Sequence, residues 1–259
     1  MDEYGQMLKS EMNKYTLTKS ATRKDSSVMR QRSLLHFIVI GLALFVFAIP
    51  QLFAKSAAEQ EALVEKARLT FESFIADPNL SWFRDNVKKA KGILIYPQIL
   101  KGAFFIGGSG GSGVLLVRDE KTGKWSQPAF YTVGSGSFGL QFGGQALETV
   151  LMIMSAKGIR ALYSSSFNLG GDMAVAAGPV GVRAEGSTPM NFSADFISFA
   201  RSKGAFIGFS LEGAVIATRD KWNEAYYGKP VSPTDIIVKG SVNNSQSEKL
   251  RAAVAKGTK

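Results

Sequence analysis

Residues 101–144 have the sequence KGAFFIGGSGGSGVLLVRDEKTGKWSQPAFYTVGSGSFGLQFGG, in which twelve glycines separate runs of Val, Leu, Phe and Tyr. Each interior glycine costs a helix about 1 kcal/mol relative to alanine. Short β-branched and aromatic runs bounded by glycine are instead typical of strands that are joined by tight turns or bent by bulges. The stretch therefore predicts an antiparallel sheet that is closed or strongly coiled.

Helices are expected on both sides of this block. Apolar residues at helical spacing predict a helix over Ala58–Ile75, which Asp77-Pro78 ends, and a short second helix over Leu80–Ala90. A helical turn is expected at Lys157–Tyr163, and further helices at Thr218–Tyr227 and Ser245–Ala255. A hairpin loop is expected at Asp119–Lys124, and either a strand or a helix at Leu147–Met154. The expected strands are Gly92–Tyr96, Ala103–Gly107, Gly113–Arg118, Trp125–Val133, Ser137–Phe142, Asp172–Glu185, Ala194–Arg201 and Ala205–Ala217. The predicted fold class is α+β, a glycine-rich antiparallel β-barrel or sandwich with peripheral helices, preceded by one N-terminal hydrophobic segment.

That hydrophobic segment is Leu34–Ala54, with Phe37, Leu44, Phe47 and Phe53 among its apolar residues and Arg30 and Arg32 before it. It is long enough for a transmembrane anchor, and it also has the parts of a cleavable signal peptide, so both interpretations stay open. Basic residues on its N-terminal side favour export of the chain beyond Ala54. We expect three regions: a polar basic extension over 1–33, the signal or anchor over 34–54, and a single domain over 55–259 in the periplasm or cell envelope, or outside the cytoplasm on an inner-membrane anchor.

The residue types that the chain lacks exclude several kinds of site. It has no cysteine, and its one histidine, His36, lies inside the apolar segment. A Ser-His-Asp triad and a histidine or cysteine metal site are therefore excluded from the domain, and we expect no catalytic residue, no metal and no cofactor. Carboxylates remain as an alternative catalytic set, provided that two of them converge; the candidates are Glu148, Asp172, Glu185, Asp195 and Glu212.

Two stretches match the dinucleotide-binding pattern G-x-G-x-x-G, at Gly108–Gly113 and at Gly134–Gly139. The pattern binds pyrophosphate only where a helix follows the glycines. The first match continues into the strand-like VLLV and the second into GLQFGG, so neither is expected to bind a nucleotide.

The formal charge of +10 favours an anionic partner. Nucleic acid is not expected, because no known nucleic-acid-binding motif accompanies the basic residues. If the predicted turns share one rim, their cations form a patch for lipid headgroups. The candidate lipid-binding residues are Lys88, Lys89, Lys91, Lys101, Lys121, Lys124, Lys157, Arg160, Arg201 and Lys203.

From about residue 60 to residue 239 the chain resembles the SYLF family, a lipid-binding domain that also occurs as an actin-binding domain in yeast-type endocytic proteins. The matching segments are AKGILIYPQILKGAFFIGGSGGSGVLLVR, WSQPAFYTVGSGSFGLQFGGQ, DMAVAAGPVGVRAEG, ARSKGAFIGFSLEGA and NEAYYGKPVSPTDII, in this order. The resemblance implies a non-enzymatic module that docks on anionic phospholipid, phosphoinositides in eukaryotic relatives, through basic residues and an amphipathic helix, for which Ala58–Ile75 is the candidate. It also leaves open a protein-interaction or actin-binding scaffold role. The export segment makes the chain look like a bacterial envelope member of that family.

Overall fold

The structure is a computed structural model that describes residues 57–103, 106–138, 143–180, 193–202, 205–207 and 211–259. All of them belong to one compact unit, Lys55–Lys259. The predicted signal or anchor, Leu34–Ala54 with Leu34, Phe37, Leu44, Phe47 and Phe53, lies outside the described residues. Within the described ranges, no helix has the length and apolarity needed to cross a bilayer.

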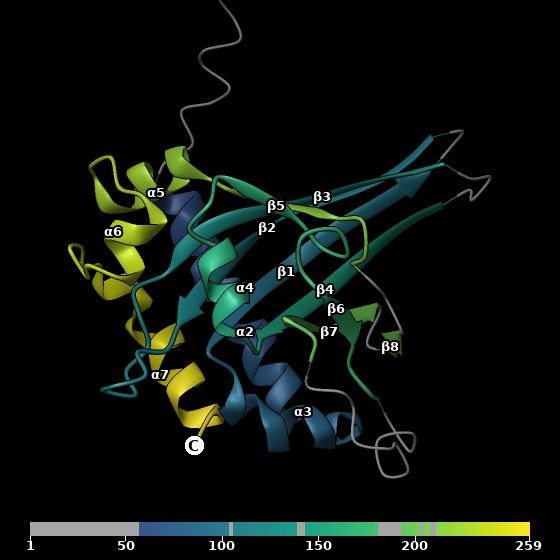
Figure 1. Cartoon of the computed structure of the whole chain (residues 1–259), viewed down its shortest axis with the longest axis horizontal. Coiled ribbons are helices and arrows are strands. Elements are labelled where there is room, and N and C mark those ends of the chain that lie inside the picture. The colour runs from purple at the N-terminus through teal and green to yellow at the C-terminus, as the bar shows by residue number, and fades with distance from the viewer. Residues whose placement is uncertain (1–56, 104–105, 139–142, 181–192, 203–204, 208–210) are drawn as a thin grey trace, which may run out of the picture. The chain divides into compact units, whose positions relative to one another are not determined.

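The core of the unit is one nine-stranded sheet (Figure 1). Its strands run in the order β5-β9-β3-β2-β1-β4-β7-β6, with β8 paired to β7, and every pair is antiparallel except β6 with β7. The strands are β1 (Gly92–Ala103), β2 (Ile106–Val117), β3 (Ala129–Phe138), β4 (Gly143–Ile153), β5 (Ser166–Asn168), β6 (Val175–Ala177), β7 (Phe196–Ser202), β8 (Ala205–Ile207) and β9 (Val215–Thr218).

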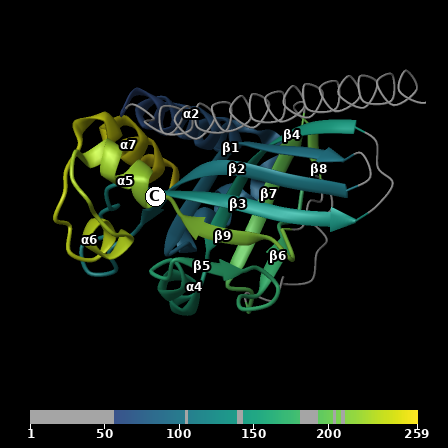
Figure 2. The same ribbon diagram turned by 90° about the horizontal axis from the view of Figure 1, so that it is seen from above.

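The predicted α+β class is confirmed, with a single curled sheet in place of a barrel or a two-sheet sandwich. In Figure 2 β7 runs across the direction of β1 and β2. Among the described residues β5 and β6, at the two ends of the strand order, do not pair with each other, so the ladder does not close. Strongly twisted sheets coil in this way without closing.

The sheet is buried on both faces, which explains the almost continuous apolar sequence of β1. Ile93 and Ile95 point to one core, and Leu94 and Tyr96 point to the other. We call the first face the helix face, because α2, α3, α5 and α7 pack on it. The helices are α2 (Ala57–Ala76), α3 (Ser81–Asn86), α4 (Ala156–Ala161), α5 (Asp220–Tyr227), α6 (Pro233–Ile237) and α7 (Glu248–Gly257), with 3-10 turns η2 (Pro78–Leu80), η3 (Val87–Lys89) and η5 (Ser245–Ser247).

The opposite core is covered by α4, β5 and α6, which contribute Ala161, Phe167 and Ile236. At Gly113 this core needs a glycine, because a Cβ there would lie 2.5 Å from the ring of Tyr96. The prediction that the glycine block forms strands is therefore confirmed, and close packing accounts for this glycine.

Some predicted boundaries were wrong. Ala103–Gly107 is no separate strand, because β1 ends at Ala103 and β2 begins at Ile106. In Asp172–Glu185 only β6 is a described strand, and residues from 181 onward lie outside the description. Ala205–Ala217 contains β8 and the start of β9, because the chain turns at Gly213, where φ is +80°. Leu147–Met154, left undecided from the sequence, lies almost entirely in β4.

Candidate functional site

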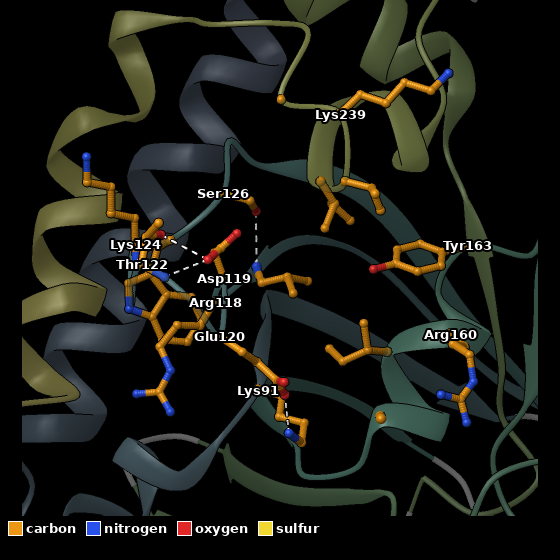
Figure 3. Close-up of a pocket in the computed structure, with 17 residues that line it drawn as sticks. Lys91, Arg118, Asp119, Glu120, Thr122, Lys124, Ser126, Arg160, Tyr163 and Lys239 are labelled. Atoms are coloured by element: carbon orange, nitrogen blue, oxygen red, sulfur yellow. Dashed lines mark hydrogen bonds and ion pairs between the residues drawn. The ribbon is translucent and has the colours of Figure 1, made fainter.

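A cavity of about 550 Å³ lies at the end of the sheet where the hairpin loop joins β2 to β3 (Figure 3). We call it the basic cavity. Its lining includes five cationic side chains and two carboxylates, so its local charge is positive. The cations are Lys91, Arg118, Lys124, Arg160 and Lys239, and the carboxylates are Asp119 and Glu120.

The hairpin loop holds one side of the cavity in a fixed shape. The Asp119 carboxylate accepts hydrogen bonds from the backbone N–H groups of Lys121 (2.9 Å) and Thr122 (2.7 Å), and from the Thr122 hydroxyl (3.0 Å). Gly123 adopts φ +71° and its N–H donates to the Asp119 carbonyl. The hydrogen bonds from Thr122 lower the pKa of the exposed Asp119 carboxyl. The turn thereby fixes the point from which Lys124 projects.

Lys91 lies immediately before β1, where backbone hydrogen bonds hold it in place. Its backbone N–H donates to the Ile153 carbonyl, and its carbonyl accepts from the Arg118 N–H, both at 2.8 Å. Its ammonium group forms an ion pair with Glu120, which lowers the pKa of that carboxyl. Lys91 is thus already partly neutralised by the loop opposite it.

Arg118 stands beside an aromatic side chain that the C-terminal helix holds in place. Its guanidinium carbon lies 6.0 Å from the centre of the Trp125 ring. The indole N–H donates to Thr258, and the Trp125 carbonyl accepts two hydrogen bonds from Arg251 of α7, at 3.1 and 2.9 Å. The position of Arg118 therefore depends on residues more than 125 positions away in the sequence.

The remaining wall comes from α4 and the end of α6. Ser155 caps α4 by accepting from the Gly158 N–H at 2.9 Å, which places Arg160 in the last turn. Burial raises the pKa of Tyr163, and Figure 3 shows its hydroxyl directed toward the middle of the labelled residues. Lys239 follows α6 and donates to Asp235 at 2.9 Å.

Three of the five cavity cations form no close ion pair with a described carboxylate, although the charge of Arg118 helps to lower the pKa of Glu120. Among the described residues, no carboxylate forms an ion pair with Arg118, Lys124 or Arg160, whereas Lys91 and Lys239 are paired. An arginine guanidinium is always charged and can bind an oxyanion with two parallel hydrogen bonds. Lys124 and Arg160 lie on opposite sides of the cavity in Figure 3, so its positive charge is spread around the rim.

A second cavity of about 270 Å³ adjoins the first and shares Lys91 and Arg118 with it. It adds Lys89, whose ammonium group donates to Asn86 at 2.8 Å. The two cavities together extend the basic surface from α4 to the turn before β1.

The structure brings four of the ten predicted lipid-binding residues to these cavities: Lys89, Lys91, Lys124 and Arg160. Lys88 and Lys121 are sequence neighbours of these residues but line neither cavity. Lys101 lies far along β1, about 33 Å from Lys91 at the usual rise of a strand. Lys203 lies outside the described residues.

Two of the predicted residues make structural contacts. The Arg201 guanidinium hydrogen-bonds Glu148 and donates to Ser73 at 2.8 Å, and it lies 5.1 Å from the centre of the Phe74 ring. Lys157 donates to the Asp172 carbonyl at 3.0 Å. Arg201 therefore ties α2 to β4 and β7.

Two cavity cations, Arg118 and Lys239, were not among the predicted binding residues. Arg118 directly follows the strand-like VLLV and precedes the hairpin loop, which was a usable signal. Lys239 had no local signal, because only the tertiary fold brings the end of α6 beside the loop.

Among the described candidate carboxylates, Glu212 lies in the turn before β9. Three others make the following structural contacts. Glu148 pairs with Arg201, Asp172 accepts from the Asn168 N–H at 2.8 Å, and Asp195 accepts from Ser155 and from the Ala174 N–H at 3.1 Å. Glu185 lies outside the described residues. Within the described part of the chain, no group of three or more His, Asp or Glu side chains is placed to hold a metal ion.

Comparison with known proteins shows which family the sequence is similar to. Residues 134–257 match the Ysc84 family model, described as "Las17-binding protein actin regulator". The human SH3 domain-containing YSC84-like protein 1 is 30% identical over 165 residues, which cover 63% of this chain and 48% of the relative. Protein YSC84 of Saccharomyces cerevisiae is 33% identical over 174 residues, covering 63% of this chain and 36% of the relative. Residues 134–257 therefore match the Ysc84 (SYLF) family, and the chain spans less than half the length of these relatives.

Proposed function

We propose that this domain is a non-enzymatic module that docks on anionic phospholipid through the basic cavity. The observation that carries the proposal is that Arg118, Lys124 and Arg160 line one cavity and form no close ion pair with a described carboxylate. Arg118 is half-buried and Lys124 and Arg160 are exposed, so an anionic headgroup at the domain surface can contact them.

The magnitude of the electrostatic contribution supports a measurable effect. Each basic residue near an anionic membrane surface contributes about 1 kcal/mol, and the attraction decays within a Debye length, about 10 Å at 0.1 M salt. Three cations therefore account for about 3 kcal/mol, or roughly a hundredfold in affinity.

Co-sedimentation with vesicles tests the proposal. One set contains only phosphatidylcholine and the other also contains phosphatidylglycerol, each at low and at high salt. We expect binding to the anionic vesicles that falls as salt increases, and little binding to the neutral ones. Equal binding to both vesicles, or binding that salt leaves unchanged, would contradict electrostatic docking.

A protein-binding role is a second candidate. The description of the matched family, a Las17-binding actin regulator, favours it. Co-sedimentation with filamentous actin tests the actin version, and no enrichment over the protein alone dismisses that version.

The site of action is a further part of the proposal. The apolar segment Leu34–Ala54 with basic residues before it supports export of the domain. N-terminal sequencing of the protein from a membrane fraction tests this, since an intact N-terminus indicates an anchor, a start near residue 55 indicates cleavage, and recovery of an intact chain only from the soluble fraction contradicts export.

A further inference from the structure

The glycine-rich ends of β3, β2, β1 and β4 form a second unusual surface, at the end of the sheet opposite the basic cavity. Figure 1 shows these strand ends extending past the helices. Gly136 pairs with Gly108, and Gly134 pairs with Gly110. In residues 99–113 and 133–147 the only charged side chain is that of Lys101.

A Cβ on Gly108 would lie only 3.3 Å from the Ser135 carbonyl oxygen, but neither packing nor backbone conformation in the described structure accounts for the other three glycines. None of the four is among the glycines with positive φ. A Cβ on Gly136 would meet nothing within 4 Å, and one on Gly134 or Gly110 would meet only a carbonyl oxygen at 3.9 or 3.7 Å. A strand glycine without a local cause often marks the close approach of another chain.

Among the described residues, no strand pairs with the outer edge of β3 beyond Gly134. Strand β9 pairs with β3 only from Tyr131 to Gly134. It reaches no further because the chain turns away at Gly213, and the Ala214 N–H donates to the Leu211 carbonyl at 3.0 Å. No described strand lies beside the last four residues of β3.

The register identifies which backbone groups are left unpaired at this edge. The Phe130 carbonyl accepts from the Arg219 N–H, so the backbone groups of Phe130 point away from β2. Alternate residues of an antiparallel strand point the same way, and the β2–β3 register has no shift between Ala129 and Phe138. The N–H and C=O groups of Gly136 and Phe138 therefore point outward.

This edge lacks the features that normally block strand addition. Native edges are protected by charges, prolines or bulges, and Gly134–Phe138 contains none of them. On the helix face two nearby apolar side chains are exposed, since Val215 is 41% exposed and Leu100 is 58% exposed. On the opposite face lie Ser109 and Ser135, whose hydroxyls hydrogen-bond each other at 2.8 Å.

We propose that the outer edge of β3 at Gly136 and Phe138 binds an extended segment of a partner protein. The segment adds a strand antiparallel to β3 and carries a large apolar side chain opposite Gly136, with small polar side chains at the alternate positions. Unpaired edge groups are satisfied by a strand and not by a helix. An aromatic residue opposite an edge glycine covers that glycine. The site lies at the other end of the strands from the basic cavity and does not depend on anion docking.

Short synthetic peptides that alternate Tyr and Thr, capped at both ends, test the proposal by fluorescence anisotropy with the full-length chain. In an antiparallel pair, the peptide residue opposite Gly136 is also the one that hydrogen-bonds to it. N-methylation of the Tyr residues should therefore weaken binding at least tenfold, and N-methylation of the Thr residues should not. Equal effects of the two methylation patterns, or no binding of the unmethylated peptide, overturn the proposal.

Two variants at one position complete the test. Gly136→Pro removes the outward N–H and should abolish peptide binding, whereas Gly136→Ala keeps that N–H and should weaken binding much less. Retained binding of the Gly136→Pro variant to anionic vesicles, through the opposite end of the domain, confirms that this variant is folded. If the variant does not fold, the comparison of the two methylated peptides alone decides whether the edge binds a strand. Sedimentation velocity tests whether a second copy of this chain, and not a partner protein, binds the edge of β3. A dimer that Gly136→Pro disrupts would overturn the assignment to a partner protein.

Discussion

The guanidinium of Arg118 lies 6.0 Å from the centre of the Trp125 ring, and the Trp125 carbonyl accepts two hydrogen bonds from Arg251. The hairpin that carries the basic cavity is thus fixed by the C-terminal helix. This arrangement makes the cavity sensitive to changes in α7, although α7 contributes no residue to its lining.

Arg251→Ala should lower the free energy of unfolding by about 1.5–3 kcal/mol, the usual range for a hydrogen bond to a charged group. It should also weaken binding to anionic vesicles, because Trp125 and Arg118 lose their support. Urea unfolding and co-sedimentation measure the two effects. The exposed Lys249→Ala on the same helix is the control. An Arg251→Ala variant with unaltered stability would show that α7 does not hold the hairpin.

Arg201→Met should destabilise the domain by about 2–3 kcal/mol and leave vesicle binding by the folded protein unchanged. The Arg201 side chain is only 15% exposed and hydrogen-bonds Glu148, so its loss leaves a partly buried carboxylate without its charge partner. Adding Glu148→Gln should recover part of the loss, which urea unfolding of the double variant measures. Weaker vesicle binding at full stability would instead assign Arg201 to the lipid site.

Two glycines in the same block should respond oppositely to alanine. Gly113→Ala should cost about 1–3 kcal/mol, because its Cβ would lie 2.5 Å from the Tyr96 ring. Gly136→Ala should be neutral or stabilise by up to about 1 kcal/mol, because its Cβ meets nothing within 4 Å and alanine restricts the unfolded chain. Thermal unfolding compares them, and equal shifts would contradict the packing described.

Acid should weaken the hairpin loop. The pKa of Asp119 is lowered in the folded state, so its contribution to stability is present above the unfolded pKa, near 4, and is lost as the pH falls through the folded value. Asp119→Asn should therefore reduce the loss of stability between neutral pH and acid. Urea midpoints across this range measure it, and identical pH profiles for the two proteins would show that Asp119 contributes nothing.

Local patterns were sufficient for much of the fold. Helical spacing placed Ala58–Ile75 within one residue of each end of α2, and the polar run Asp119–Lys124 does form the hairpin loop. The boundary between β1 and β2 was missed because no Pro, Asn or Asp interrupts the apolar sequence between Lys101 and Gly107.

The candidate site was only partly predictable. Lys91 and Lys124 lie beside a predicted strand and in a predicted turn, so both were identified as surface cations. Lys239 reaches the cavity, and Arg201 enters an ion pair, only through contacts between distant parts of the chain. A local sequence pattern does not show which lysine or arginine forms an ion pair with a carboxylate in the folded domain.

The central claim is that the domain docks on anionic lipid through the basic cavity. The most direct test compares two triple variants that lose the same positive charge at different places on the domain. One variant replaces Arg118, Lys124 and Arg160 with glutamine, and the other replaces the exposed Lys221, Lys249 and Lys256 of α5 and α7 with glutamine, so both have the same net charge. Affinity for vesicles containing phosphatidylglycerol is measured at one salt concentration. We predict roughly a hundredfold loss for the cavity variant and only a small loss for the control. Equal losses in the two variants would contradict docking through the basic cavity.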